Sequence, residues 1–491
     1  MKVTERKSLL PRSFLRLLCA SFLVCPLLLS AQTNSGYPNA PSTSRPSTFP
    51  SGLGGSQSPF SGSVPEDKIT PGSLPLSFKD AIDRGLKNNL GLLLQGDSSL
   101  AARGQRWQEL SDLLPHLSAD ITENAAQDNL AARGLRFPGF PVVVGPYGYF
   151  DARVYLKQSL FDLSALNRTR AASANERAAQ LTYKDARDIV VLAVGNAYLQ
   201  ALAGAARVET AEAQAETAKA LADKAADQLK AGVSPAIDSL RARVEWQSRQ
   251  QQAIVARNDF AKQKLALARA IGLPAGQEFT LTEKAPYSPL ATASLEEDLH
   301  RAYLSRSDYL AAAQRVRAAE YSRKAASAKY LPDISINANY GDLGVAPGDS
   351  HGTFQVTGGI RIPIFEGGKT HGEVLQAEAG LRQNRQQLAD LRAQIEYEVR
   401  VAFLDLAAAT EQVEVAHSTV DLADQAMIQA RDRFTAGVAD NLEVVQAQEA
   451  VAAAHESYIS SLYAHNIAKV ELARAIGFAE EGVKQYLESK P

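Results

Sequence analysis

Cysteine is almost missing from this chain of 491 residues. Its two cysteines, Cys19 and Cys25, both lie in a segment from Met1 to Ala31 that has basic residues, an apolar run (Leu17 to Leu29) and a small-residue ending. This pattern predicts a secretory signal peptide over residues 1–31. A membrane anchor is the alternative, but the apolar run is short for a span. The exported chain would hold no cysteine, which excludes a disulfide framework and a thiol site.

Long apolar runs and a charge excess are missing too. Beyond the signal peptide no stretch reaches the ~20 apolar residues of a membrane-spanning helix, and the longest dense run is Ile189 to Val194. The net charge is −2, with acidic and basic residues interspersed, which gives no reason to expect a nucleic-acid partner. If the chain crosses a membrane, it does so with strands.

Recognisable catalytic motifs are the third absence. The sequence has no nucleophile elbow, P-loop or dinucleotide fingerprint. Its histidines are scattered, without the spacing to cysteine or carboxylate that a metal site requires: His116, His300, His351, His371, His417, His455 and His465. We therefore predict that the protein is not an enzyme and needs no cofactor or metal.

What is present is strict alternation in two segments, which predicts strands at about 333–341 and 353–365. Apolar residues alternate there with polar ones, and a loop rich in Gly, Asp and Pro separates the segments. A similar alternation earlier in the chain predicts two more strands, at about 117–126 and 151–161. Alternation places one set of side chains on each face of a strand. Each run has about ten residues, the length of a tilted strand that crosses a bilayer.

The remaining segments predict long helices. Proline-free stretches cover 164–231 and 367–435, and a helix of that length would be ~100 Å long. Shorter helices are predicted over 235–271 and 440–476, after breaks at Gly232 and Gly437, where glycine suits the left-handed helix end. We also expect Ser77 to cap the first helix, and Ser234 to be the N-cap of the helix after Gly232.

The sequence is internally duplicated. The two breaks lie 205 residues apart, and Leu267–Gly272 matches Leu472–Gly477 residue for residue at the same offset. We divide the chain into a signal peptide (1–31), a disordered Pro/Ser/Gly-rich linker (32–75), a first repeat (76–272), a connector (273–293), a second repeat (294–477) and a C-terminal tail (478–491). The predicted fold is mainly α with a small β part.

The predicted strands distinguish between two architectures, a soluble coiled-coil rod and a membrane barrel. The Ala-rich helices alone favour a soluble coiled-coil rod. Membrane strands, however, must form closed barrels of about eight strands or more, and one chain supplies four. Several copies must therefore close the ring, and three would give a twelve-stranded barrel continued by a helical barrel. Such a tube is a conduit.

The motifs resemble the TolC-type outer-membrane efflux protein family over about residues 76 to 480. They are Leu331-Pro332 before a strand, Pro363 to Lys369 at a strand–helix junction, the Ala-Gly-Val breaks and the Leu-Ala-Arg-Ala-Ile-Gly helix ends. Asn88-Asn89-Leu90 is similar to the family's Asn-Pro-Asp/Glu-Leu. The first half departs from the pattern, because Phe161-Asp162-Leu163-Ser164 stands where Phe-Asp-Gly-Gly is usual.

The resemblance implies a homotrimer in the outer membrane of a Gram-negative-type bacterium, with a periplasmic helical tunnel. Its implied partners are a periplasmic membrane-fusion adaptor, an inner-membrane pump of RND, ABC or MFS type, and outer-membrane lipid. The implied function is that of a passive channel in a tripartite efflux or type I export system. The alternative is a non-channel periplasmic or surface structural coiled-coil protein.

Three groups of residues are candidates for function. The hairpin tips Gly232, Val233, Gly437 and Val438 would meet the adaptor, or would only form the turns. Asp238, Glu443 and Gln446 would constrict the periplasmic entrance, where acidic residues favour cations. Asp440-x-x-Glu443 also reads as a capping box. The predicted pore-lining strand residues are Asp120, Thr122, Lys157, Ser335, Asn337, Asn339 and Arg361.

Overall fold

The computed structural model describes residues 59–65, 69, 71–136, 138–283, 287, 294–436, 438, 441–480 and 482. All of them belong to one compact unit that begins at Gly55. The predicted signal peptide, most of the predicted linker, part of the connector, Gly437 and most of the tail lie outside the described residues.

The two halves of the chain contain helices of nearly equal lengths in the same order. The first half has α1 (Phe78–Asn88, 11 residues), α2 (Leu90–Ser111, 22), α3 (Leu163–Lys230, 68) and α4 (Ala236–Ile271, 36). The second half has α5 (Leu295–Ser305, 11), α6 (Ser307–Ala328, 22), α7 (Lys369–Thr435, 67) and α8 (Asn441–Ile476, 36). The duplication in sequence is thus matched by a duplication in helix length.

Local sequence explains where the helices begin. Ser77 caps α1, because its hydroxyl accepts the amide of Asp80 at 3.1 Å and the Asp80 carboxylate accepts from Ser77 in return. The expected cap at Ser234 is wrong. Pro235 occupies the N-cap position of α4, and the Ser234 hydroxyl donates to the Asp238 carboxylate at 3.2 Å.

The first helix, which we expected to begin after Ser77, is two helices, α1 and α2. Asn89 ends α1 and caps α2, because its side-chain oxygen accepts the amides of Gly91 and Leu92 at 3.0 and 3.4 Å. In the second half, Arg306 occupies the matching break between α5 and α6. A side chain that bonds the backbone at a helix start competes with continuous helix, which the apolar spacing alone does not reveal.

The linker and connector are not wholly irregular, contrary to the prediction for 32–75. A short strand, β1 (Leu74–Leu76), pairs in parallel with β4 (Phe279–Leu281) from the connector. Upstream, a short 3₁₀ turn (Pro59–Ser61) carries Phe60, whose carbonyl accepts the Asn89 side-chain amide at 2.7 Å. These few apolar residues pack against the helices. They were not predicted to do so, because the segment around them is rich in Pro, Ser and Gly.

The main sheet is antiparallel, with the order β2-β3-β5-β6. Its strands are β2 (His116–Asn129), β3 (Val143–Phe161), β5 (Asp333–Gly344) and β6 (Ser350–Arg361). β3 begins at Val143 and not near 151, since its first residues pair with the end of β2. β6 ends at Arg361 and not at 365, just before Pro363, which has no amide to donate to a ladder.

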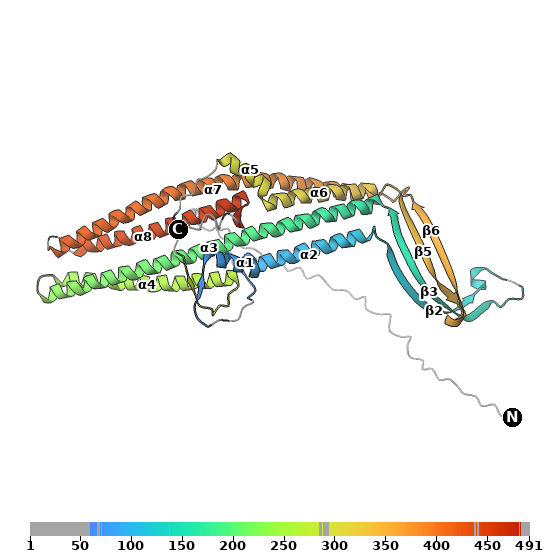
Figure 1. Ribbon diagram of the computed structural model, residues 1–491, viewed down its shortest axis with the longest axis horizontal. Coiled ribbons are helices and arrows are strands. Elements are labelled where there is room, and N and C mark those ends of the chain that lie inside the picture. Colours follow the sequence, from blue (N-terminus) through green and yellow to red (C-terminus); the bar gives the residue numbers. More distant parts are fainter. Residues whose placement is uncertain are drawn as a thin grey trace, which may run out of the picture. The chain divides into compact units, whose positions relative to one another are not determined.

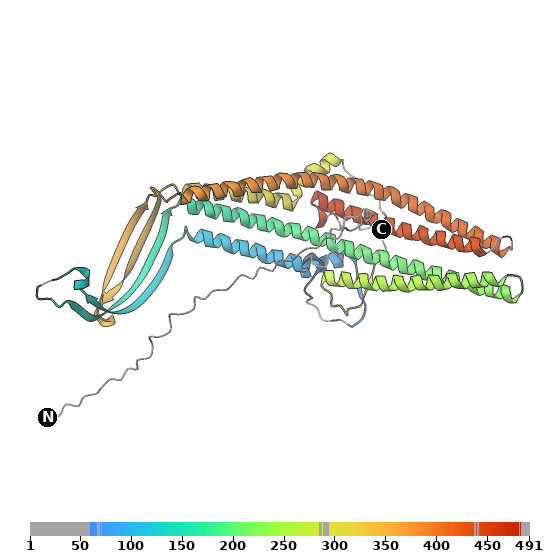
Figure 2. The same cartoon turned by 180° about the vertical axis from the view of Figure 1, so that it is seen from behind.

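The strands lie at one end of α3 and α7, and the turns of the α3–α4 and α7–α8 hairpins lie at the other end (Figures 1 and 2). The principal core joins α1, α3 and the ends of α4 and α8, and a second core joins α5, α7 and α8. Tyr198 of α3 is fully buried, and its hydroxyl donates to the carbonyl of Leu76 at 3.2 Å. The cores therefore lie midway between the sheet and the hairpin turns.

Among the described helices, α3 alone has an 18-residue window that is apolar enough for a membrane span. The sequence had suggested no such helix. More than half of that window, 56%, is buried inside the molecule, and Val190, Val191 and Val194 of α3 belong to the principal core. Packing in that core accounts for its apolar character.

Candidate functional site

All seven predicted pore-lining residues lie on one face of the sheet. In an antiparallel sheet, directly paired residues share a face. Asp120 pairs with Arg153, and Lys157 pairs with both His116 and Asn337. The other predicted residues fall on the same alternate positions of their strands: Thr122, Ser335, Asn339 and Arg361. The register thus produces one polar face across four strands.

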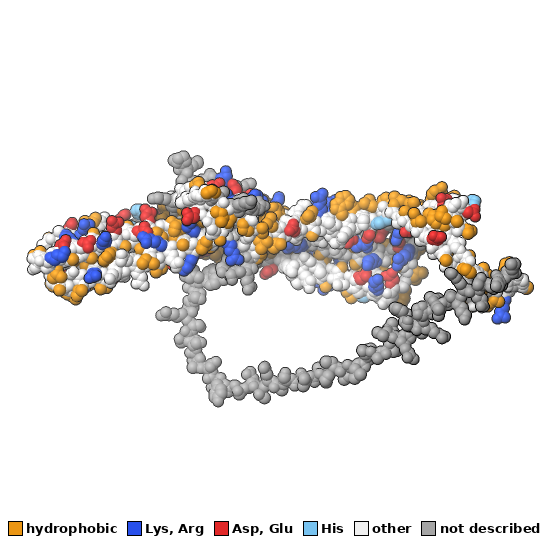
Figure 3. Space-filling view, turned by 90° about the horizontal axis from the view of Figure 1, so that it is seen from below, with side chains coloured by type: hydrophobic (Ala, Val, Ile, Leu, Met, Phe, Trp, Pro, Cys, Tyr) orange, Lys and Arg blue, Asp and Glu red, His pale blue; other side chains and the backbone are white. Residues whose placement is uncertain are grey.

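The opposite face is apolar. One row across the sheet is Leu117, Leu156, Ala338 and Val356, and the next is Ala119, Val154, Tyr340 and Phe354. Phe354 and Ile121 of this face are 77% and 75% exposed, and hydrophobic side chains gather over the strand end in Figure 3. A contiguous apolar surface of this kind marks a contact with membrane or protein.

The outermost strands of the sheet and the outermost helices of the bundle lie on the same two sides of the molecule. Each strand continues the end of a long helix, so the strand order β2-β3-β5-β6 repeats the helix order α2-α3-α6-α7. Among the described strands, β2 and β6 are paired on one side only. The helices that lead to these edges expose large apolar side chains, Trp107 on α2 and Leu404 on α7 among them. Both edges therefore leave backbone groups and apolar side chains exposed in the described chain.

The two hairpin turns have the same backbone design. At the first, the amides of Gly232 and Val233 donate to the carbonyls of Leu229 and Gln228, each at 3.0 Å, and Gly232 has φ +73°. At the second, the amide of Val438 donates to Arg433 at 3.1 Å, while Gly437 lies outside the described residues. These bonds form the helix-ending motif that favours glycine.

Both valines point into solvent, although the residue at this position often packs back on its helix. Val233 is 73% exposed and Val438 is 69% exposed. Each hairpin therefore presents an apolar side chain at its end.

Two of the predicted entrance residues, Asp238 and Glu443, occupy equivalent positions in the two repeats but have different surroundings. Asp238 is buried, accepts the Ser234 hydroxyl and lies 3.8 Å from the Arg241 guanidinium. Glu443 is partly exposed and forms an ion pair with Arg433 at 3.3 Å. Gln446 is exposed. Within one chain the acidic charge at Glu443 is thus paired by an arginine of the preceding helix.

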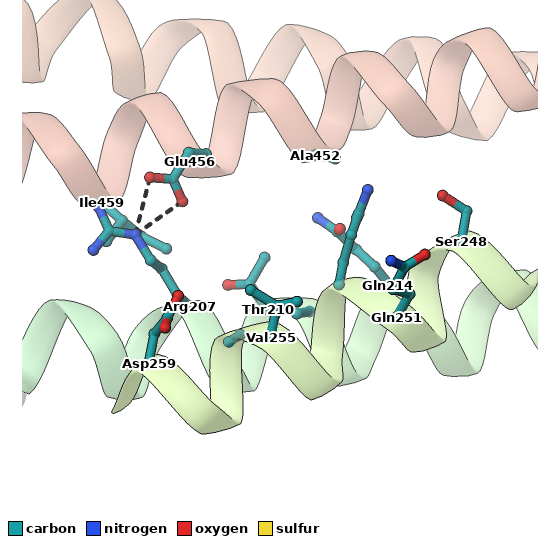
Figure 4. A pocket seen from close by; sticks show the side chains of 13 residues that line it. Arg207, Thr210, Gln214, Ser248, Gln251, Val255, Asp259, Ala452, Glu456 and Ile459 are labelled. Atoms are coloured by element: carbon teal, nitrogen blue, oxygen red, sulfur yellow. Dashed lines mark hydrogen bonds and ion pairs between the residues drawn. The ribbon is translucent and has the colours of Figure 1, made fainter. Parts of the chain in front are cut away.

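A groove of about 600 Å³ runs between α3, α4 and α8 (Figure 4). Arg207 of α3 crosses it, with its Nε 2.9 and 3.0 Å from the two Glu456 carboxylate oxygens and its Nη2 3.2 Å from the Ser460 hydroxyl. Local sequence patterns do not indicate this pair, because its members lie in different repeats. The contact joins the two hairpins, although a pair this exposed contributes only about 0–1 kcal/mol.

A group of buried ion pairs lies near the end of α8, and one of them joins the two repeats. These pairs were not predicted from the sequence. Arg306 is 2% exposed, and its guanidinium donates to Asp308 and Glu398, both at 2.6 Å. Arg474 of α8 bonds Asp185 of α3. Burial raises the pKa of Asp188, one turn on, to about 6 against the opposing charge of Arg474. In the described part of the chain, no group of three or more His, Cys, Asp or Glu could hold a metal.

Comparison with known proteins bears on what this arrangement does. The model of the outer membrane efflux protein family matches residues 84–273 and 299–478. The alkaline protease secretion protein AprF of Pseudomonas aeruginosa is 23% identical over 425 residues, covering 83% of this chain and 87% of that protein. The outer membrane protein TolC of Vibrio cholerae is 20% identical over 338 residues, covering 67% and 77%.

Solved structures share the fold. The CmeC outer membrane channel of Campylobacter jejuni superposes with a TM-score of 0.72 at 17% identity, covering 88% of this chain and 94% of that one. The outer membrane protein VceC of Vibrio cholerae superposes with a TM-score of 0.70 at 20% identity, covering 82% and 96%. With a family match over both repeats and a sheet of one polar and one apolar face, the chain belongs to the outer membrane efflux protein family.

Proposed function

We propose that three copies of this chain form an outer-membrane channel that works as a passive conduit in a tripartite efflux or type I export system. The observation that carries the proposal is the four-stranded sheet, with one polar face, one apolar face and two unpaired edges. Four strands are too few to close a barrel, whereas twelve fall within the range of membrane barrels. In that arrangement the polar face lines the pore and the apolar face meets lipid.

The exposed edges support closure by copies of the same chain. The β6 and α7 edge of one copy would pair with the β2 and α2 edge of the next, covering Leu404 and Trp107 at the same time. The helices would then continue the barrel as an α-helical tunnel in the periplasm. Neither the fold nor the family supplies a reason to propose catalysis.

The hairpin tips are the proposed contact with a periplasmic membrane-fusion adaptor, which would link the channel to an inner-membrane pump. Val233 and Val438 support this role, since both turns leave an apolar side chain in solvent. Gly232 is needed for the turn itself, because its backbone is left-handed. The names of the relatives include protease secretion and toluene efflux, and we propose that cargo choice lies with the pump.

The proposed entrance constriction is tested by Glu443→Gln. This change removes the partner of Arg433 and leaves its positive charge, so three copies would turn a balanced ring into a cationic one. We expect the cation-to-anion permeability ratio to fall at least about twofold in single-channel recordings at low salt, where screening is weak. Restoring the ratio in Glu443→Gln/Arg433→Gln would confirm the charge as the cause. An unaltered ratio in Glu443→Gln would remove these residues from the entrance.

The channel proposal is tested by the state of the purified protein. We expect a trimer in detergent by light scattering, retention in outer membranes after washing with high salt and high pH, and conductance in a planar bilayer. A monomer that dissolves without detergent would reject the channel and favour the structural coiled-coil alternative, which the family match does not support.

A further inference from the structure

Two polar side chains of α8 are buried without a partner in the part of the chain that the structure describes. His465 is 0% exposed and Lys469 is 1% exposed. Neither imidazole nitrogen of His465 has a hydrogen-bond partner. Nor does any described residue form a hydrogen bond or ion pair with Lys469. Buried polar groups in folded proteins are nearly always paired, whereas the described residues offer these two side chains no partner.

The position of the pair explains its burial. Residues four apart stand one above the other on a helix, so His465 and Lys469 share one side of α8. The helix packs into a hydrophobic cluster on either flank of them, through Ala468 and Leu472 with α7, and through Val470 and Ala473 with α3. The Tyr287 ring covers the imidazole, with ring centroids 5.3 Å apart. Both side chains therefore lie in the wedge between these two clusters.

The electrostatics of the wedge favour an anion. Burial lowers the pKa of Lys469 to about 8, and no acidic group among the described residues opposes that shift. Burial, and then the charge of Lys469, lower the pKa of His465 to about 4. Near neutral pH the wedge thus holds one ammonium charge and one neutral imidazole. A buried charge without a counter-charge is strongly unfavourable, and one cation with N–H donors on both sides suits a monovalent anion.

The equivalent lysine of the first repeat is only partly buried and lies beside aromatic rings. At the offset of 205 residues, Phe260 and Lys264 occupy the positions of His465 and Lys469. The Lys264 ammonium lies 5.7 Å from the centroid of the Phe260 ring and 4.9 Å from that of Phe279. Two aromatic faces attract a cation, so this lysine needs no anion. The unpartnered arrangement is specific to the second repeat.

We infer that His465 and Lys469 bind a small monovalent anion, chloride or a free carboxylate, between α3, α7 and α8. The anion would supply the missing counter-charge in the core that joins the repeats, and so would stabilise the folded chain. This site is separate from the proposed pore and does not depend on the channel function.

The test is thermal unfolding of the purified full chain in detergent. Chloride, or in a second arm acetate, replaces methanesulfonate at constant ionic strength. We expect the wild-type midpoint to rise by about 2–4 °C over a hundredfold increase in chloride or acetate, because an anion that binds only the folded state stabilises it. Lys469→Met should lose that response, and Lys469→Arg should keep it. Lys264→Met is the matched control and should respond as wild type does.

His465→Phe, which copies the first repeat, should weaken the response without removing the lysine charge. Chloride-35 line broadening by the wild-type protein, absent in Lys469→Met, would show binding directly. A wild-type midpoint that ignores both anions would overturn the site, as would a Lys469→Met variant that responds like wild type. If only chloride acts, the site excludes carboxylates by size, and acetate-only stabilisation would assign it to them.

Discussion

Replacing Val438 with aspartate should abolish pump-dependent export while leaving trimers in the outer membrane at wild-type levels. The side chain is 69% exposed at the end of the α7–α8 hairpin, so the fold should tolerate the change, as exposed substitutions usually alter stability by about 0.5 kcal/mol or less. A carboxylate in an apolar contact must be desolvated without a partner. Losing a central apolar contact costs about 2 kcal/mol in an interface, and the proposed trimer repeats the loss three times.

Export is measured as the resistance of cells to a substrate of the pump, or as secreted cargo, beside trimer abundance in outer-membrane fractions. Val438→Ile is the matched control, because it keeps the apolar surface and should keep export. Val233→Asp tests the other hairpin and should behave in the same way. Normal export by Val438→Asp at normal trimer abundance would mean that the adaptor does not rest on this tip.

Replacing Gly341 with alanine should prevent assembly of the sheet. A Cβ atom at this position of β5 would meet the carbonyl oxygen of Ala152 and lie 2.5 Å from the Cα of Arg153. Both obstacles are backbone atoms of β3, so no side-chain rotation relieves the contact. Overpacking costs about 1–3 kcal/mol where neighbours can adjust, and more is expected where a strand must move.

The matched control is Gly358→Ala in β6. A Cβ atom there has nothing within 4 Å, so the same chemical change should leave assembly intact. The measurement is the fraction of trimer in outer membranes by non-denaturing electrophoresis. Trimers of Gly341→Ala at wild-type abundance and thermal stability would show that β3 and β5 can separate at this point, and the register between them would need revision.

The assignment of residues to the two faces of the sheet could be predicted from the alternation of polar and apolar residues alone. Whether a residue such as Asn337 or Lys157 lies on the polar or the apolar face depends only on its parity within the strand, and parity is a property of local sequence. The helix break at Gly232 and the helix start at Ser77 could be predicted for the same reason, since turn and cap preferences act over a few residues. The strand ends were less accurate, because β3 is extended by pairing with β2.

The contacts between the two repeats could not be predicted from the sequence. Arg207 meets Glu456, and Arg474 meets Asp185, across more than 200 residues of chain. A pattern with a period of a few residues carries no information about which helix lies beside which. The short strand β1 was missed because its pairing with β4 depends on the helices that bring the linker and connector together.

The sequence by itself thus determined the length and order of the long helices α3, α4, α7 and α8, the two faces of each strand and the duplication. Tertiary structure decided which charges became paired or buried. His465 and Lys469 show the difference: a histidine and a lysine on an Ala-rich helix are typical of a solvated face, and only the packing of α8 between α3 and α7 takes them out of water. Burial is set by neighbours from distant parts of the chain, and local periodicity cannot specify it.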